Sequence, residues 1–177
     1  MRRSWLIGVA LLVAGCTSQT PGSPTQVADG GTSAAASTTS AGPSSGRPAS
    51  IKSCSLLSAS DVQVLGISTV GEEQESKSRS SCLWRVEKPV AGNSYSIDVS
   101  FYKERSLGEL VSDHERTPVQ VGEHKGVKVL GDMDSGCIIA LEVTATSRVD
   151  VRAIGGDSAG LCGVAMAAAE RVEARLP

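Results

Sequence analysis

Residues 17–50 restrict most strongly what this chain can fold into, because they consist almost entirely of Gly, Pro, Ser, Thr and Ala. Such a segment cannot bury enough apolar surface to offset the entropy lost on ordering, so we expect a disordered linker. A coil of this composition and length has a root-mean-square span of about 30 Å. The folded part of the chain is therefore expected in residues 51–177, a length typical of one domain.

The residues before the linker have the layout of an export signal. Arg2 and Arg3 precede an apolar run from Trp5 to Ala14, which is too short to cross a membrane as a helix. The run ends in Val13-Ala14-Gly15-Cys16, which resembles the lipobox of bacterial lipoproteins.

This resemblance implies removal of residues 1–15 and a diacylglyceryl group on Cys16. Acyl chains such as palmitate would then hold the mature chain on the extracytoplasmic face of the cell membrane. The alternative is a secreted soluble protein in which Cys16 is an incidental thiol.

Four cysteines fall within residues 51–177, namely Cys54, Cys82, Cys137 and Cys162. An even number in an exported chain indicates two disulfides, because nothing outside the cytoplasm keeps thiols reduced. Of the three possible pairings we favour Cys54–Cys82 and Cys137–Cys162, since each joins neighbours in sequence and the two loops are similar in length. The alternative, a zinc site that also uses His114 and His124, lacks the usual C-x₂₋₄-C element, so no metal is expected.

Alternation of apolar and polar residues predicts several strands. The clearest runs from Ser94 to Phe101, and Cys82 to Val86 alternates just before it, so these two segments should form a hairpin with a turn near Ala91–Asn93. A second hairpin is expected from 119–121 and 127–129, around a turn at 122–126. Two further strands are expected at 137–144, covered on both faces, and at 148–153, half-exposed.

Three segments have helical signals. Ser58 to Leu65 should form a short helix, capped by Ser58 or Ser60, and Leu107 to His114 could form another. The chain should end in a longer helix from Ser158 to Leu176, whose apolar residues recur at helical spacing. The expected fold class is α+β: an antiparallel sheet with helices packed on one face and two disulfides.

Several stretches together resemble a known family. They are CSLLSASDVQVLG at 54–66, CLW at 82–84, VGEHKGVKV at 121–129, Cys137 on a predicted strand, and Cys162 opening a helix that ends in ARLP. The pattern is similar to an actinobacterial lipoprotein family, the domain-of-unknown-function family numbered 3558, and to mycobacterial Lpr-type lipoproteins. This resemblance implies an envelope lipoprotein with paired disulfides and supports the pairing given above. It implies no reaction and no catalytic residues.

Signals for catalysis or ligand binding are few. The chain lacks an H-E-x-x-H motif, and we expect His114 and His124 to be solvated surface residues. The Gly-rich segment 154–160 precedes a helix, where backbone N–H groups could meet an anion, but a turn capped by Asp157 or Ser158 is favoured. An acidic turn is expected at Asp132, Asp134 and Ser135, and Trp84 is expected in the core.

Charge and motifs together favour binding over catalysis. The chain has 17 Lys and Arg against 19 Asp and Glu, and removal of Arg2 and Arg3 leaves 15 against 19, a balance of −4, which argues against a nucleic-acid partner. We expect a membrane-anchored lipoprotein that acts as a non-catalytic binding or accessory module of the cell envelope, without a cofactor. Its partner would be an envelope protein or a small ligand. The alternative function is an envelope hydrolase with an unrecognised active site.

Overall fold

The computed structural model describes residues 50–131 and 136–177. Cys16 and the expected signal and linker segments therefore lie outside the described residues. The acidic turn expected at Asp132, Asp134 and Ser135 also lies outside them.

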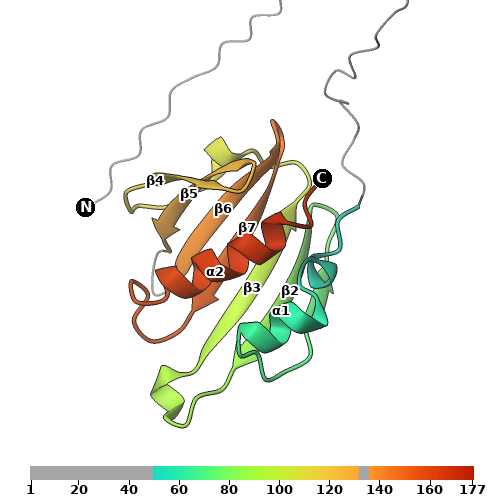
Figure 1. Ribbon diagram of the computed structural model, residues 1–177. Helices are drawn as coiled ribbons and strands as arrows, with labels where there is room; N and C mark the ends of the chain where they lie inside the picture. Colours follow the sequence, from blue (N-terminus) through green and yellow to red (C-terminus); the bar gives the residue numbers. More distant parts are fainter. Residues whose placement is uncertain (1–49, 132–135) are drawn as a thin grey trace, which may run out of the picture. The chain divides into compact units, whose positions relative to one another are not determined.

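The described residues form a seven-stranded sheet in which every neighbouring pair of strands is antiparallel (Figure 1). The strand order is β1-β2-β3-β7-β6-β5-β4, so the first and last parts of the domain meet where β3 pairs with β7. The expected antiparallel sheet is thus confirmed. The strands are β1 (Glu72–Glu75), β2 (Arg79–Val86), β3 (Tyr95–Tyr102), β4 (Thr117–Val121), β5 (His124–Leu130), β6 (Cys137–Thr144) and β7 (Ser147–Ile154).

The helices of the described residues are short, apart from the last. They are the α-helices α1 (Ala59–Val64) and α2 (Cys162–Glu173) and the 3₁₀ helices η1 (Ser53–Leu56), η2 (Ala91–Asn93) and η3 (Leu107–Glu109). Helix α1 begins with a capping box, in which Ser58 Oγ accepts a hydrogen bond from Asp61 N and Asp61 Oδ2 accepts one from Ser58 N. The helix is terminated by Leu65 as the C-cap and by the following Gly66, whose φ of 67° is easily reached only by glycine.

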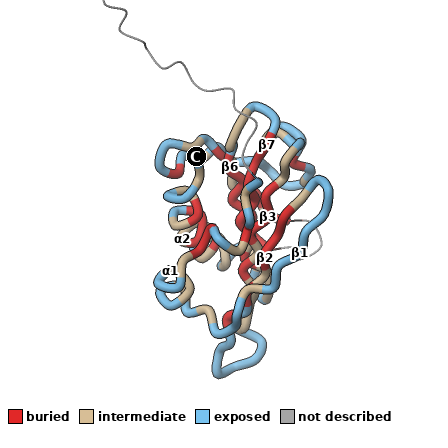
Figure 2. Tube along the Cα trace, turned by 90° about the vertical axis from the view of Figure 1, so that its right-hand side faces the viewer, coloured by how far each residue is buried: buried red, intermediate tan, exposed pale blue. Residues whose placement is uncertain are grey.

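The main core lies between the sheet and α2. Alternate residues of β3 point to this side, so that Ile97, Val99 and Phe101 are fully buried. The matching side of α2 is made mostly of alanines, Ala165, Ala168 and Ala169, together with Val172, all buried. Figure 2 shows the buried residues along the central strands and on the side of α2 that faces them. Small side chains let the helix approach the strands closely, which suits the dense packing of a core.

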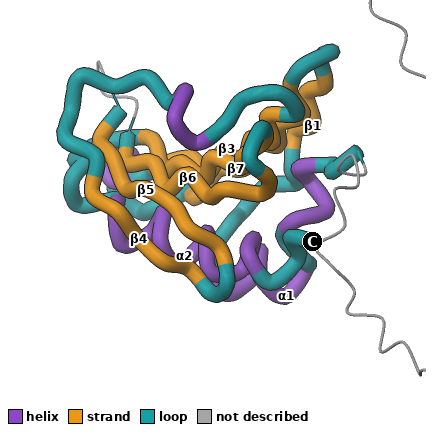
Figure 3. Tube along the Cα trace, turned by 90° about the horizontal axis from the view of Figure 1, so that it is seen from above, coloured by secondary structure: helices purple, strands orange, loops and turns teal. Residues whose placement is uncertain are grey.

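The opposite face of the sheet is covered only in part. The connection from β3 to β4 crosses it and places Leu107 and Leu110 on Val129, Ile138 and Ala140, which form a second, smaller core. Figure 3 shows α1 and α2 on one side of the strands and this connection on the other. The remainder of this face, over β2, β3 and β7, is mostly polar, with Leu83 of β2 lying opposite Asp98.

Two disulfides tie the first and last helical segments to the sheet. Cys54 of η1 is bonded to Cys82 of β2, and Cys137 of β6 is bonded to Cys162, the first residue of α2; each pair has a Cα–Cα distance of 5.0 Å. This is the pairing that we favoured from the sequence. Because all four cysteines are in disulfides, their sulfur atoms do not form the alternative zinc site.

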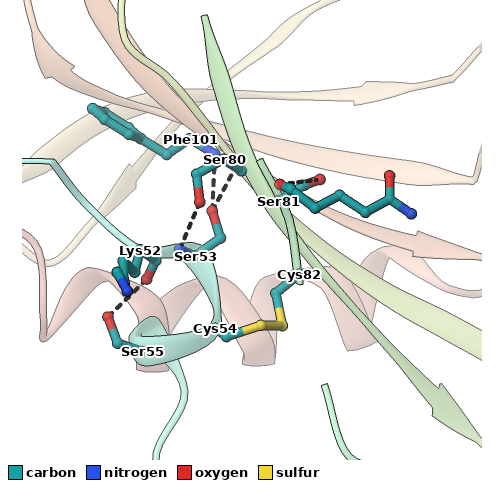
Figure 4. Close-up of a disulfide and its surroundings, with 9 residues drawn as sticks. Lys52, Ser53, Cys54, Ser55, Ser80, Ser81, Cys82 and Phe101 are labelled. Carbon is teal, nitrogen blue, oxygen red and sulfur yellow. Dashed lines mark hydrogen bonds between the residues drawn. A yellow bond between two sulfur atoms is a disulfide. The ribbon is translucent and has the colours of Figure 1, made fainter. Parts of the chain in front are cut away.

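Buried hydroxyl groups reinforce the first disulfide (Figure 4). Ser53 Oγ donates a hydrogen bond to the Ser80 carbonyl oxygen at 2.7 Å and accepts one from Phe101 N at 3.3 Å. Ser53 N in turn donates to Ser80 Oγ at 3.1 Å. Both serines are fully buried. The polar groups of η1 are therefore satisfied by β2 and β3, which fixes this turn on the sheet.

Both outer strands carry residues that disfavour pairing with another sheet. All four residues of β1 are exposed, and three of them are glutamates, Glu72, Glu73 and Glu75. Strand β4 contains Pro118 as its second residue, and this proline has no N–H to donate. Charged residues and proline are typical of protected sheet edges.

Several elements differ from those expected. Strand β1 was not predicted, because its acidic sequence has low strand propensity; it forms along the free edge of β2. The segment predicted as a helix from Leu107 to His114 contains only the single turn of η3. Helix α2 begins at Cys162 instead of Ser158. Strand β7 was expected to be half-exposed, but Arg148 and Asp150 are both buried.

Candidate functional site

The face of the sheet turned away from α2 carries charged and hydroxyl side chains on β2, β3 and β7. The register places Tyr102 opposite Arg148, Ser100 opposite Asp150 and Asp98 opposite Arg152. We call this surface the polar face and define it by Gln74, Arg79, Ser81, Arg85, Asp98, Ser100, Tyr102, Arg148, Asp150 and Arg152.

A buried ion pair lies at the centre of the polar face. Asp150 is fully buried and accepts hydrogen bonds from Arg148 Nε at 2.8 Å and from Arg148 Nη2 at 3.4 Å. Arg148 is itself held by the Ser106 carbonyl oxygen at 2.8 Å and by the ring of Tyr102, whose centroid lies 4.6 Å from the guanidinium carbon. This fork-like arrangement gives the pair a single well-defined geometry.

Two neighbouring groups are less well satisfied. Arg152 Nη2 reaches Asp150 Oδ2 and Tyr102 Oη only at 3.5 Å, and its buried Nε has no hydrogen-bond partner among the described residues. Asp98 lies directly opposite Arg152, yet its carboxylate accepts a hydrogen bond from Ser100 Oγ at 2.8 Å and forms no ion pair in the described part of the chain. Burial raises the pKa of Asp98, although the Ser100 hydrogen bond and the charge of Arg152 oppose this shift.

Burying such a group of charges lowers the free energy of unfolding of a small domain unless the charges are well paired. Removing ions from water costs several kcal/mol each, and their mutual attraction offsets this only where the geometry and additional hydrogen bonds are good. Arg148 and Asp150 meet that condition, whereas Arg152 and Asp98 do not. Departures from the rules of stable folding are commonest at functional sites, and this makes the polar face a candidate binding surface.

A second candidate lies near the other edge of the sheet. A cavity of about 450 Å³ opens between β4, the end of β5 and the start of α2. We call it the edge cavity. Its lining residues are His114, Glu115, Thr117, Lys128, Val129, Leu130, Ala159 and Cys162.

Comparison with known proteins places the chain in a family. The model of a family described as "Protein of unknown function (DUF3558)" matches residues 11–175. The chain belongs to DUF3558. No curated protein and no solved structure matches the chain. Membership of DUF3558 therefore identifies the family of the chain but no activity. Inference about function must then rest on the geometry of the domain.

The histidines of this DUF3558 domain differ in their surroundings. His114 is exposed at the edge cavity, as expected. His124 was expected to be solvated but lies in an ion pair, with its Nδ1 3.0 Å from Glu173 Oε1 and its side chain 15% exposed. This contact joins the β4–β5 turn to the end of α2, and the His124 hydrogen bond lowers the pKa of Glu173. His124 thus stabilises the packing of the β4–β5 turn against the end of α2.

The sequence reasoning overlooked a G-x-S-x-G motif. Residues 156–160, Gly-Asp-Ser-Ala-Gly, fit the G-x-S-x-G pattern and lie between β7 and α2, in the order strand, turn and helix. In the described residues, however, no hydrogen bond joins Ser158 Oγ to a histidine, and the sheet is antiparallel, unlike that of α/β-hydrolases. Asp157 does not cap α2 but accepts a hydrogen bond from Ala159 N in the preceding turn.

Metal-binding clusters and membrane-spanning helices are both absent from the described residues. Among the described residues, no group of three or more His, Cys, Asp or Glu is arranged to hold a metal ion. No helix within residues 50–131 and 136–177 is long and apolar enough to cross a membrane. Trp84, predicted in the core, is 3% exposed and packs in the main hydrophobic cluster.

Proposed function

We propose that this DUF3558 protein is an actinobacterial cell-envelope lipoprotein, similar to mycobacterial Lpr-type lipoproteins, whose domain is a non-catalytic binding module. In this proposal Cys16 carries the lipid anchor, residues 16–50 form a disordered tether, and the polar face contacts another envelope protein. The lipobox-like stretch before Cys16 and the composition of residues 17–50 support the anchor and the tether.

The observation that carries the binding proposal is the incomplete satisfaction of Asp98 and Arg152. A partner surface could offer an acceptor to Arg152 and a donor to Asp98, and would thereby satisfy both groups. Arginine and tyrosine are enriched in protein interfaces, and the polar face contains four arginines and Tyr102. Charges of both signs on one face would also select a partner with the complementary arrangement.

Photo-crosslinking tests the polar face in the native membrane. A photoreactive residue at Gln74, which is exposed at the margin of the polar face, should form a discrete adduct with one envelope protein. The matched control is Gln63, an exposed glutamine of α1 on the helix side. An excess of unlabelled protein should compete away the Gln74 adduct.

A substitution on the polar face provides the second part of the crosslinking experiment. Arg152→Gln should abolish the Gln74 adduct, whereas Arg171→Gln, on the helix side, should leave it intact. Thermal unfolding of both variants checks that the fold is retained. Equal adducts from Gln63 and Gln74, or an adduct insensitive to Arg152→Gln, would exclude the polar face as the binding surface.

The anchor is tested by fractionation. Cys16→Ser should move the protein from the membrane fraction to the soluble fraction, because one residue would supply both acyl chains. Mass spectrometry of the native protein should show a diacylglyceryl modification on Cys16 as the first residue. Retention of the Cys16→Ser variant in the membrane fraction would contradict the proposal.

The G-x-S-x-G pattern favours one alternative, an envelope hydrolase that uses Ser158 as nucleophile. Turnover of short p-nitrophenyl esters by the wild-type protein, abolished in Ser158→Ala, would establish this alternative. We expect no turnover, because no hydrogen bond joins Ser158 Oγ to a histidine in the described residues and a serine nucleophile needs an adjacent base.

A further inference from the structure

The edge cavity lies apart from the polar face and has the size of a small-molecule site. Its volume of about 450 Å³ falls within the range of ligand sites, about 300–1,000 Å³. Three segments build it: residues 114–117, the end of β5, which pairs with Thr117 across the β4–β5 hairpin, and the more distant residues around the start of α2. The Cys137–Cys162 disulfide fixes the last of these segments to the sheet, so the walls of the cavity are held relative to one another.

The less exposed part of the lining is apolar with a single charged group. Leu130, Cys162 and Lys128 are half-buried, whereas the side chain of Val129 is buried in the second core on the opposite face of the sheet. The other lining residues, His114, Glu115, Thr117 and Ala159, are exposed. A mostly apolar wall with a few polar groups is the usual composition of a small-molecule site, in which the polar groups fix the orientation of the ligand.

Lys128 supplies a positive charge to this wall. No ion pair in the described part of the chain involves Lys128, and its half-buried position places the methylene stem against the domain. Cys162 is the first residue of α2, so the partially positive end of that helix adjoins the same wall. Among the described residues that line the cavity, Glu115 is the one carboxylate, and it is exposed.

We infer that the edge cavity binds a small organic anion with an apolar body. The ammonium group of Lys128 would hold a carboxylate or sulfonate group, and Leu130 and Cys162 would contact the apolar part. This site is additional to the protein contact proposed for the polar face and does not depend on it.

A pair of fluorescent probes of similar size tests the inference. 1-Anilinonaphthalene-8-sulfonate carries a sulfonate on an apolar body, whereas N-phenyl-1-naphthylamine lacks the charge. Both are titrated into the full-length chain that carries Cys16→Ser, so that no acyl chains bind the probes. The sulfonate should bind saturably at one site per chain and about tenfold more tightly than the neutral probe.

Lysine variants identify the site. Lys128→Gln should weaken sulfonate binding about tenfold and leave binding of the neutral probe unchanged. The matched control is Lys125→Gln, because Lys125 is an exposed lysine of the same strand that does not line the cavity. Ala159→Trp, which places a large side chain in the cavity, should prevent binding of both probes.

Two results would overturn the inference. One is an equal effect of Lys128→Gln and Lys125→Gln on sulfonate binding; the other is the absence of saturable sulfonate binding to a chain with wild-type thermal unfolding. Binding that persists at full strength in Ala159→Trp would place the probe outside the edge cavity and contradict the inference in the same way.

Discussion

At the residue scale, the most consequential side chains are polar ones that the sequence pattern did not distinguish. Ser53 and Ser80 are ordinary serines in sequence, yet both are fully buried in a hydrogen-bonded group. Asp98 and Asp150 each occupy the polar position of an alternating strand, and alternation alone predicts solvent there. A polar position becomes buried when a neighbouring strand or the β3–β4 connection covers it. The topology of the fold determines which positions are covered, and the local sequence does not.

Ser53→Ala should destabilise the domain. The substitution removes the hydroxyl used by the Ser80 carbonyl and by Phe101 N–H, so we expect the free energy of unfolding to fall by about 1–3 kcal/mol. Urea denaturation with intact disulfides measures this change. The control is Ser55→Ala in the same helix, whose hydroxyl is exposed and should change stability by less than about 0.5 kcal/mol. Equal effects of the two substitutions would contradict the role given to Ser53.

At the element scale, periodicity and capping signals predicted much of the fold. The strands at β2, β3, β5, β6 and β7 follow from alternation, and α1 follows from its Ser58 cap. Strand β1 could not be predicted, because its glutamates have low strand propensity and its pairing depends on the free edge of β2. The edge cavity could not be predicted either, since its walls come from segments that only the tertiary fold brings together.

Helix α1 should make stability depend on pH in the acid range. Hydrogen bonds from Ser58, with contributions from Arg171 and Arg175, lower the pKa of Asp61 from 3.8 to about 2. Because the folded state has the lower pKa, the stabilisation by Asp61 is complete above about pH 4 and is lost as the pH falls toward 2.

The variant Asp61→Asn tests this dependence. At pH 7 it should be less stable than the wild type by about 1–2 kcal/mol, and this difference should vanish near pH 2. Urea denaturation over this pH range is the measurement. Glu104→Gln, at an exposed carboxylate, serves as the control and should keep the wild-type profile. A constant difference between wild type and Asp61→Asn at all pH values would refute the assignment.

Each disulfide should stabilise the domain to a similar degree. The bonded cysteines are separated by 28 residues in one pair and by 25 in the other. Loop-closure entropy then gives about 3.5 kcal/mol for each bond. Replacing either pair by alanine should lower the free energy of unfolding by roughly that amount, as measured in urea. A pair whose removal left stability unchanged would show that its loop is already constrained by packing.

At the scale of the whole molecule, the linker composition predicted a domain boundary near residue 50, whereas the different character of the two faces of the sheet emerged only from the structure. Residues 50–131 and 136–177, which the structure describes, belong to one compact unit. We expect this unit to keep its stability without the preceding segment.

Limited proteolysis checks this expectation. Proteinase K should cut first within residues 17–50 and leave a resistant fragment that begins near residue 50. The fragment should unfold thermally at the same temperature as the full-length chain. Early cleavage between β1 and α2, or a lower unfolding temperature of the fragment, would show that the preceding residues contribute to the fold.

The residues that disfavour pairing at the two sheet edges matter most when many copies of the chain lie on the same membrane surface. If the chain is anchored by its lipid, copies are confined to two dimensions and meet far more often than they would in bulk water. Two β1 strands that approached each other would bring six carboxylates together, and β4 presents Pro118 at its outer side. Repulsion between the glutamates at the β1 edge, and the missing N–H of Pro118 at the β4 edge, would keep neighbouring copies from pairing into a continuous sheet.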